Sequence, residues 1–100
     1  MARARPGELT FVGLGPLTNL ALALRLAPDL PQLFRRCIVM GGAIRSKGNF
    51  TTFAEFNIAS DPEAAEIVFS EWPRLTLVPW EAVLDMPVDA GEATDMIAGP

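Results

Sequence analysis

Three short apolar runs, at residues 9–12, 37–40 and 75–78, most strongly constrain what this chain can fold into. Each run is rich in β-branched or large apolar residues, and each is followed directly by Gly13, Gly41 or Pro79. Short apolar runs that end at such breakers are typical of buried strands. Because none of the runs alternates strictly between apolar and polar residues, we expect both faces of their sheet to be covered.

A helical pattern separates the first two runs. Pro16 is suited to the first position of a helix, and Pro28 is expected to end it. Leu22 and Leu26 widen the apolar stripe, so we expect this helix to be covered on most sides. The stripe itself follows the i, i+3, i+4, i+7 spacing of a helix and consists of Leu17, Leu20, Ala21 and Leu24.

A second helical pattern separates the second and third runs. Its start has two possible caps: Ser60 with Glu63 as a capping box, or Asp61 followed by Pro62. Pro73 is expected to end this helix. The side chains expected to face inward are Ala64, Ala65, Ile67, Val68 and Trp72.

The order strand, helix, strand, helix, strand predicts an α/β fold with a mostly parallel sheet flanked by helices. The carboxyl ends of parallel strands meet at one edge of the sheet, where ligands bind in such folds. The segments 13–19, 41–57 and 79–85 are therefore expected to share this rim. The segment 41–57 is long for a connection in a compact domain, which favours a functional loop.

Composition excludes several classes of function. With 100 residues, the chain forms one domain or less. Its eight Lys and Arg are scattered and its net charge is −4, so we expect no nucleic-acid partner. No run approaches the roughly 18 apolar residues that span a bilayer, so we expect no membrane insertion. The single cysteine, Cys37, allows a reducing compartment, and we expect a cytoplasmic protein.

The long loop carries three polar side chains of interest, Asn49, Glu55 and Asn57. In an extended stretch Glu55 and Asn57 point to the same side, with Phe56 turned into the core. A carboxylate with amides suits a polyol, whose hydroxyls both donate and accept. The alternative is a loop whose side chains cap its own backbone.

The other two rim segments carry weaker signals. Residues 13–19 contain glycines between a strand and a helix, but they lack the spacing of a dinucleotide or phosphate loop. Trp80 and Glu81 follow the third strand, and we interpret them as a packing tryptophan beside a solvated glutamate. The chain contains no histidine, which removes the commonest general acid or base.

Taken together, five blocks of sequence resemble the inosine-uridine-preferring nucleoside hydrolases. The resemblance covers roughly residues 9–81 and corresponds to the middle third of a family member. We therefore expect residues 1–100 to be the central fragment of a single nucleoside hydrolase domain with a Rossmann-like fold. The blocks are GPLTNLA (15–21), VMGGA (39–43), GN (48–49), AEFN (54–57) and DPEAA (61–65).

The resemblance implies an enzyme that hydrolyses the N-glycosidic bond of ribonucleosides to ribose and a free base, with a bound calcium ion. By matching position, the backbone carbonyl of Thr18 is a calcium ligand. Asn49 and Glu55 bind ribose near its 5′-hydroxyl, Asn57 reaches the 2′/3′ side, and Met40 packs against the sugar. A homo-oligomer of the full-length protein is possible on the same grounds.

The chain also departs from the family pattern. The amino-terminal aspartate cluster, which supplies most calcium ligands and the base, is absent, as is a downstream histidine–aspartate segment. We therefore assign no catalytic residue in this chain and expect the fragment alone to be inactive. Two alternatives stay open: a non-catalytic ribose- or nucleoside-binding module, and a purely structural α/β module.

Overall fold

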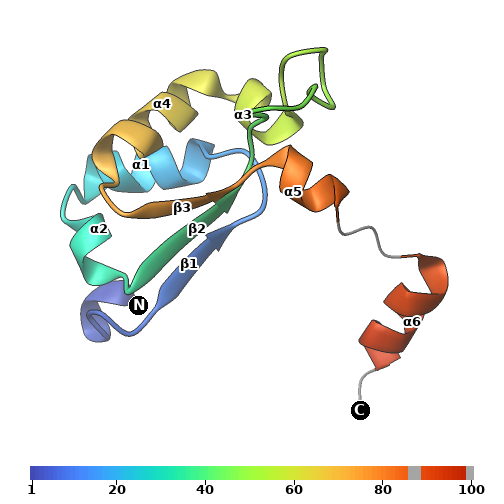
Figure 1. Ribbon diagram of the computed structural model, residues 1–100. Helices are drawn as coiled ribbons and strands as arrows, with labels where there is room; N and C mark the ends of the chain where they lie inside the picture. The colour runs from blue at the N-terminus through green and yellow to red at the C-terminus, as the bar shows by residue number, and fades with distance from the viewer. Residues whose placement is uncertain (86–88, 99–100) are drawn as a thin grey trace.

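A computed structural model describes residues 1–85 and 89–98, and it has the predicted α/β architecture (Figure 1). Three parallel strands form one sheet in the order β1-β2-β3. In the register, Phe11 lies beside Cys37, and Val39 lies beside Leu77. The strands are β1 (Thr10–Gly13), β2 (Arg36–Met40) and β3 (Leu75–Val78), which confirms the three predicted runs to within one residue at each end.

Helices α1 and α4 lie side by side on one face of this sheet, whereas α6 stands apart from it (Figure 1). The two long predicted helices are therefore present. The shorter elements η1, α2, α3 and α5, and also α6, have no counterpart in the sequence predictions. The helices are η1 (Ala2–Ala4), α1 (Thr18–Leu26), α2 (Leu30–Leu33), α3 (Phe56–Ser60), α4 (Pro62–Glu71), α5 (Trp80–Leu84) and α6 (Ala90–Ala98).

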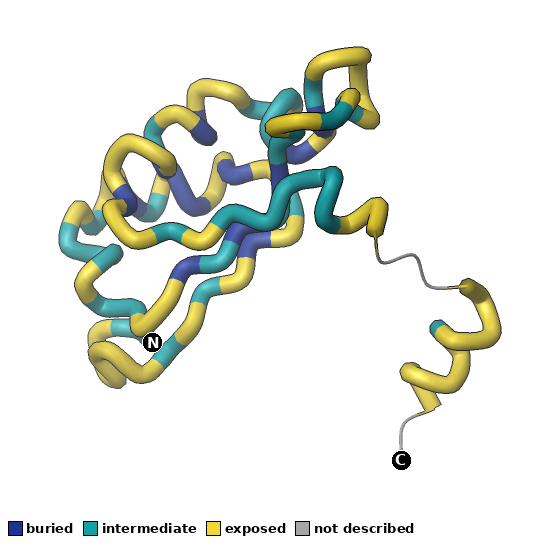
Figure 2. Tube along the Cα trace, viewed as in Figure 1, coloured by how far each residue is buried: buried dark blue, intermediate teal, exposed yellow. Residues whose placement is uncertain are grey.

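The hydrophobic core lies between the sheet and the pair α1 and α4, where Figure 2 shows the buried segments in dark blue. Trp72 closes one end of it and packs on Phe34, with 5.9 Å between ring centroids. Burial raises the pKa of the Cys37 thiol to about 11, so this cysteine is an unreactive core residue. The buried apolar residues are Leu17, Leu20, Ala21, Leu24, Cys37, Val39, Ala64, Ala65, Val68 and Trp72.

Two predictions about α1 were wrong. Pro16 does not occupy the first helical position, because α1 begins at Thr18 with Leu17 as its N-cap. Leu22 and Leu26 are 58% and 88% exposed, so α1 is covered on one side only. The physical reason is that α1 packs against the sheet and α4 on one side only, and its opposite side faces solvent.

The start of α4 decides between the two predicted caps. The Asp61 side chain accepts a hydrogen bond from the Ala64 N–H at 3.0 Å, whereas the Ser60 hydroxyl donates to the Phe56 carbonyl. Asp61 followed by Pro62 is therefore the cap. Ser60 instead ends the short helix α3.

The prediction that both faces of the sheet are covered was also wrong for the described residues. Alternate strand residues face α1 and α4, and the residues between them face the opposite side, where Val12 is 53% exposed. This second face, formed by Val12, Ile38, Met40, Thr76 and Val78, is called the open face below. Among the described helices, none combines the length and apolar character needed to cross a bilayer.

Candidate functional site

The three predicted rim segments meet at the carboxyl ends of the strands. The Asn57 amide nitrogen donates to the Leu14 carbonyl at 3.3 Å, which joins the loop after β1 to α3. The Trp80 N–H donates to the Gly42 carbonyl at 2.8 Å, which joins the segment after β3 to the loop after β2. The shared rim is therefore confirmed.

Glu55 lies at the centre of this rim and is only 2% exposed. One carboxylate oxygen accepts the Asn57 N–H at 2.9 Å. The other accepts the N–H groups of Gly42 and Ile58 at 2.9 and 3.1 Å. Glu55 is extended and directly precedes α3, so its side chain caps that helix. A carboxylate has about four acceptor positions, so three backbone donors leave room for about one more hydrogen bond.

Asn57 is buried beside the end of β2. Its amide nitrogen donates to the Met40 carbonyl at 3.1 Å and lies 3.3 Å from the Met40 sulfur. The predicted extended stretch is wrong here, because α3 begins at Phe56 and Asn57 lies within it. Phe56 is consequently half exposed rather than turned into the core. The structure nevertheless brings Met40, Glu55 and Asn57 together.

Asn49 is held close to Glu55 by a local bond, because its side-chain oxygen accepts the Phe56 N–H at 2.7 Å. The tight turn around it also contains the Gly48 N–H, which donates to the Thr52 carbonyl at 3.0 Å. Asn49, Glu55 and Asn57 thus make the backbone bonds that a self-capped loop requires. Their contact with a sugar stays a prediction.

Thr18 takes part in a separate contact. Its hydroxyl donates to Asp61 at 2.5 Å, and this bond, followed by the Ala64 N–H, lowers the pKa of the Asp61 carboxyl. Thr18 and Asp61 border a hollow of about 170 Å³ between α1 and α4. Glu55 borders a different hollow of about 290 Å³. The structure therefore does not place Thr18 in the same hollow as Glu55.

The described residues do not form a calcium site by themselves. Calcium takes about 6–8 oxygen ligands, and the Thr18 carbonyl is one neutral donor. Within residues 1–85 and 89–98, no group of three or more His, Cys, Asp or Glu is arranged to hold a metal ion. Any calcium site would need most of its ligands from outside the described residues.

The sequence predictions missed the role of Glu81. Its carboxylate accepts the Ile44 N–H at 3.0 Å and also the Arg45 N–H. The bond from Ile44 lowers the pKa of the Glu81 carboxyl most, followed by the bond from Arg45. Glu81 is therefore a hydrogen-bond acceptor for the loop backbone and not merely a solvated side chain. Its position on the predicted rim was the available signal.

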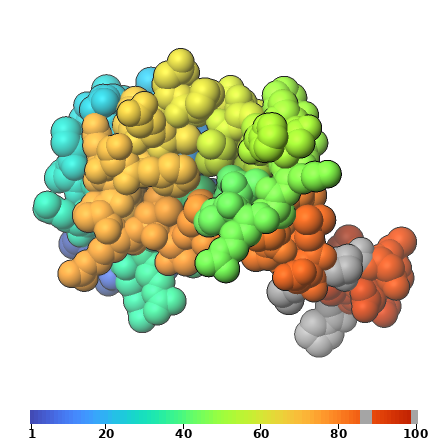
Figure 3. Space-filling model, turned by 45° about the horizontal axis from the view of Figure 1, so that its top comes forward, coloured from blue at the N-terminus to red at the C-terminus, as the bar shows by residue number. Residues whose placement is uncertain are grey.

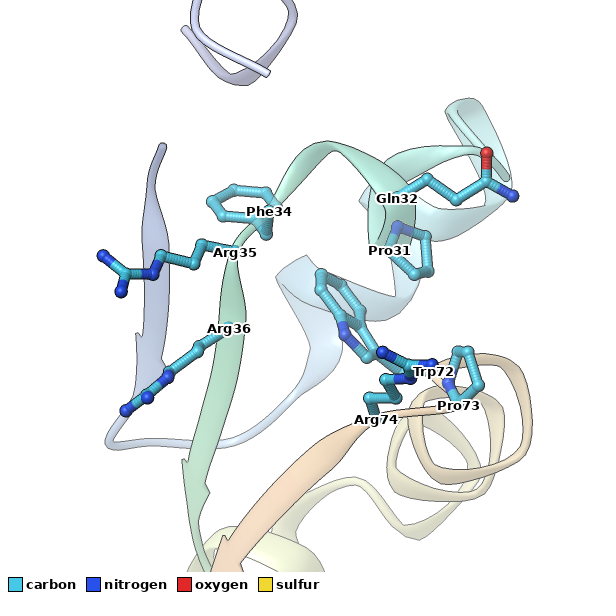
Figure 4. A pocket seen from close by; sticks show the side chains of 8 residues that line it. All are labelled: Pro31, Gln32, Phe34, Arg35, Arg36, Trp72, Pro73 and Arg74. Carbon is cyan, nitrogen blue, oxygen red and sulfur yellow. The ribbon is translucent and has the colours of Figure 1, made fainter. Parts of the chain in front are cut away.

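A further hollow of about 280 Å³ lies at the opposite end of the sheet, near the start of β2 (Figure 4). Arg35 and Arg36 extend away from Trp72, whereas Arg74 lies beside it. The three guanidinium groups do not converge on one point, so they do not form an anion site. The lining residues are Pro31, Gln32, Phe34, Arg35, Arg36, Trp72, Pro73 and Arg74.

The chain is thus an α/β domain with an open parallel sheet, an architecture in which ligands commonly bind at the carboxyl ends of the strands. The sequence model of the family described as inosine-uridine preferring nucleoside hydrolase matches residues 1–98. The chain therefore belongs to the inosine-uridine preferring nucleoside hydrolase family.

Individual relatives agree with this assignment. The chain is 45% identical over 75 residues to the pyrimidine-specific ribonucleoside hydrolase RihB of Escherichia coli O1:K1 / APEC, covering 75% of this chain and 24% of RihB. It is 45% identical over 73 residues to uridine nucleosidase 1 of Arabidopsis thaliana, covering 73% of this chain and 22% of that protein.

Among solved structures, the purine-preferring ribonucleoside hydrolase from Gardnerella vaginalis superimposes with a TM-score of 0.85 at 31% identity. That match covers 93% of this chain and 29% of the Gardnerella chain. In each of these comparisons, the chain spans less than a third of the relative's length.

Proposed function

We propose that this chain is part of a nucleoside hydrolase that cleaves the N-glycosidic bond of ribonucleosides to give ribose and a free base. The observation that carries the proposal is the cluster at the carboxyl ends of the strands, where Asn57 bonds to both Leu14 and Met40 beside the buried Glu55. Membership in the nucleoside hydrolase family over residues 1–98 also supports the proposal.

In this proposal the described residues bind and orient the sugar. Met40 supplies an apolar wall at the end of β2, and Asn57 contacts the 2′/3′ side. Asn49 and Glu55 contact the 5′-hydroxyl side, where Glu55 offers about one remaining acceptor position. Such positioning groups act on the rate because small displacements of a reacting sugar are costly. No described residue is assigned as the general base.

Other parts of the proposal concern the whole protein. It would use calcium, with the Thr18 carbonyl as one ligand and the remaining ligands from other segments. It would be cytoplasmic and act on a ribonucleoside, and it would be capable of forming a homo-oligomer. Chelation in an active full-length protein tests the metal. An unchanged rate of inosine and uridine hydrolysis after chelation would count against calcium.

One observation favours the alternative of a purely structural module. Asn49, Glu55 and Asn57 all spend hydrogen bonds on the protein's own backbone. Calorimetry of this chain with ribose and with inosine separates the possibilities. Binding of either ligand supports a sugar site in this segment. No binding at millimolar ligand removes the alternative of a ribose- or nucleoside-binding module.

Asn57→Ala in an active full-length protein is expected to lower kcat while most of the protein stays folded. The variant loses a sugar contact and the bonds to the Leu14 and Met40 carbonyls, but it keeps the backbone bond to Glu55 that caps α3. The measurement is the rate with inosine and with uridine, compared with the melting temperature. Leu26→Ala, on the exposed side of α1, is the matched control. An unchanged rate in Asn57→Ala removes this residue from the site.

A further inference from the structure

Two carboxylates from different parts of the chain bind the backbone at the beginning of the loop after β2. Glu55, which comes from the end of this loop, accepts the Gly42 N–H. Glu81, which comes from the first turn of α5, accepts the N–H groups of Ile44 and Arg45. The loop therefore leaves β2 between two fixed acceptors.

The α5 side of this arrangement has a second anchor. The Trp80 N–H donates to the Gly42 carbonyl at 2.8 Å, one residue before Glu81. Figure 3 shows the green loop segment lying directly against the orange segment that contains β3 and α5. The backbone at residues 42–45 is thus bound to an element that is more than 30 residues away in the sequence.

We infer that Glu81 is a positioning residue for the proposed sugar site, because its carboxylate fixes the path of the loop that delivers Asn49 and Glu55. The inference rests on the proposed function. Glu81 does not touch the sugar itself. It acts through the backbone of residues 44 and 45, upstream of the turn in which Asn49 bonds to the Phe56 N–H.

The distinction from a merely structural role lies in where the effect of a substitution appears. A general loss of stability would affect α1, α4 and the sheet equally. Loss of positioning would change the loop and leave the core intact, since Glu81 bonds to loop backbone and is not a member of the buried cluster. The effect should therefore extend from residue 44 to the Asn49 side chain.

The test compares Glu81→Ala, Glu81→Gln and the control Glu66→Ala by amide NMR and hydrogen exchange of this chain. Glu66 lies on the exposed side of α4, and its replacement by alanine removes the same charge as Glu81→Ala. In Glu81→Ala we expect several-fold faster exchange at Ile44 and Arg45, together with shifts at the Phe56 amide and the Asn49 side-chain amide. Glu81→Gln keeps one acceptor oxygen and should restore part of the pattern.

Changes confined to Ile44 and Arg45, with Asn49 and Phe56 as in the wild type, would overturn the inference. So would equal changes in Glu66→Ala. If ribose binds the wild-type chain, Glu81→Ala should weaken it while the melting temperature stays near that of Glu66→Ala, and unchanged affinity would also overturn it. A wild-type chain that binds no ribose removes the alternative of a ribose-binding module and leaves the proposed hydrolase function to the assay of the full-length protein, while the amide pattern still decides what Glu81 does.

Discussion

At the scale of single residues, Glu55 shows how a candidate ligand-binding group can also build its own site. Its carboxylate is almost fully buried and accepts three backbone N–H groups, from Gly42, Asn57 and Ile58. Removing a buried acceptor that has three donors lowers the stability of the fold, because each buried donor left unpaired costs about 1–3 kcal/mol.

Glu55→Ala is therefore expected to lower the free energy of unfolding by about 3 kcal/mol or more. Glu55→Gln keeps an acceptor oxygen and should cost about 1–2 kcal/mol. Chemical denaturation of both variants measures these losses. The control Glu66→Ala should stay within about 0.5 kcal/mol of the wild type. A Glu55→Ala variant as stable as this control would show that the three bonds contribute nothing.

The sequence predictions assigned Met40, Glu55 and Asn57 to one sugar site but did not predict their bonds. The structure places the three residues together, and their contact with a sugar stays a prediction. The error lay in treating residues 55–57 as extended, because a helix of five residues has too little apolar periodicity to be recognised. Glu81 escaped for a similar reason: its acceptor role depends on a backbone segment 36 residues earlier in the chain.

At the scale of elements, Asp61 couples the starts of α1 and α4. One oxygen accepts the Thr18 hydroxyl and the other accepts the Ala64 N–H. Both bonds favour the charged carboxylate, so the folded-state pKa of Asp61 lies below its unfolded value. The stability that Asp61 contributes is fully present above the unfolded pKa and is lost as the pH falls through the lower folded pKa.

Asp61→Asn should consequently melt below the wild type near neutral pH, and the gap should narrow as the pH falls below about 4. Asparagine still caps a helix, so the variant isolates the charge. The measurement is the melting temperature of both proteins as a function of pH, with Glu66→Gln as the control on the exposed side of α4. A gap that stays constant down to acid pH contradicts the assignment.

The loop after β2 depends on a glycine for a steric reason. A Cβ at Gly48 would overlap the backbone of Ala54, whereas a Cβ at Gly15 would meet nothing within 4 Å. Gly48→Ala should thus displace the turn that carries Asn49 and leave the sheet and α1 intact. Amide NMR is expected to show changes confined to the loop. Gly15→Ala is the control, and a wild-type loop spectrum in Gly48→Ala would refute the close approach.

Elements with strong periodicity were predicted well, and their exposure was predicted poorly. The four residues of the predicted stripe are all buried, the N-cap Leu17 among them, whereas Leu22 and Leu26 are exposed. An apolar residue beside a stripe does not reveal whether it has a packing partner. Helix α2, which has four residues, and the caps of α1 depend on local backbone geometry that periodicity does not record.

At the scale of the whole molecule, the described helices cover the sheet on one face and leave Val12, Ile38 and Val78 on the open face. The sequence predicted two covered faces because parallel strands are usually buried on both sides. The strands are apolar as predicted, but their sequence does not reveal which helices pack on each face of the sheet.

The open face should bind a hydrophobic fluorescent dye under native conditions, because Val12 is 53% exposed there beside the partly exposed Ile38 and such apolar surface attracts these probes. A double variant, Val12→Thr with Ile38→Thr, keeps β-branched side chains in the strands and should reduce dye fluorescence. Leu26→Thr, which alters an exposed leucine on α1, is the control and should leave the signal near that of the wild type. Equal signals in all three proteins would contradict this account.

The two tryptophans lie in different parts of the molecule, so their fluorescence reports on different regions. Trp72 is buried against Phe34 at the end of the core, whereas Trp80 lies on the rim, where its N–H holds Gly42. Emission from the first reports the integrity of the packed layer. Emission from the second reports the surroundings of the loop. With Trp72 replaced by Phe, the intrinsic fluorescence of this chain becomes a local signal from the candidate site, separable from unfolding.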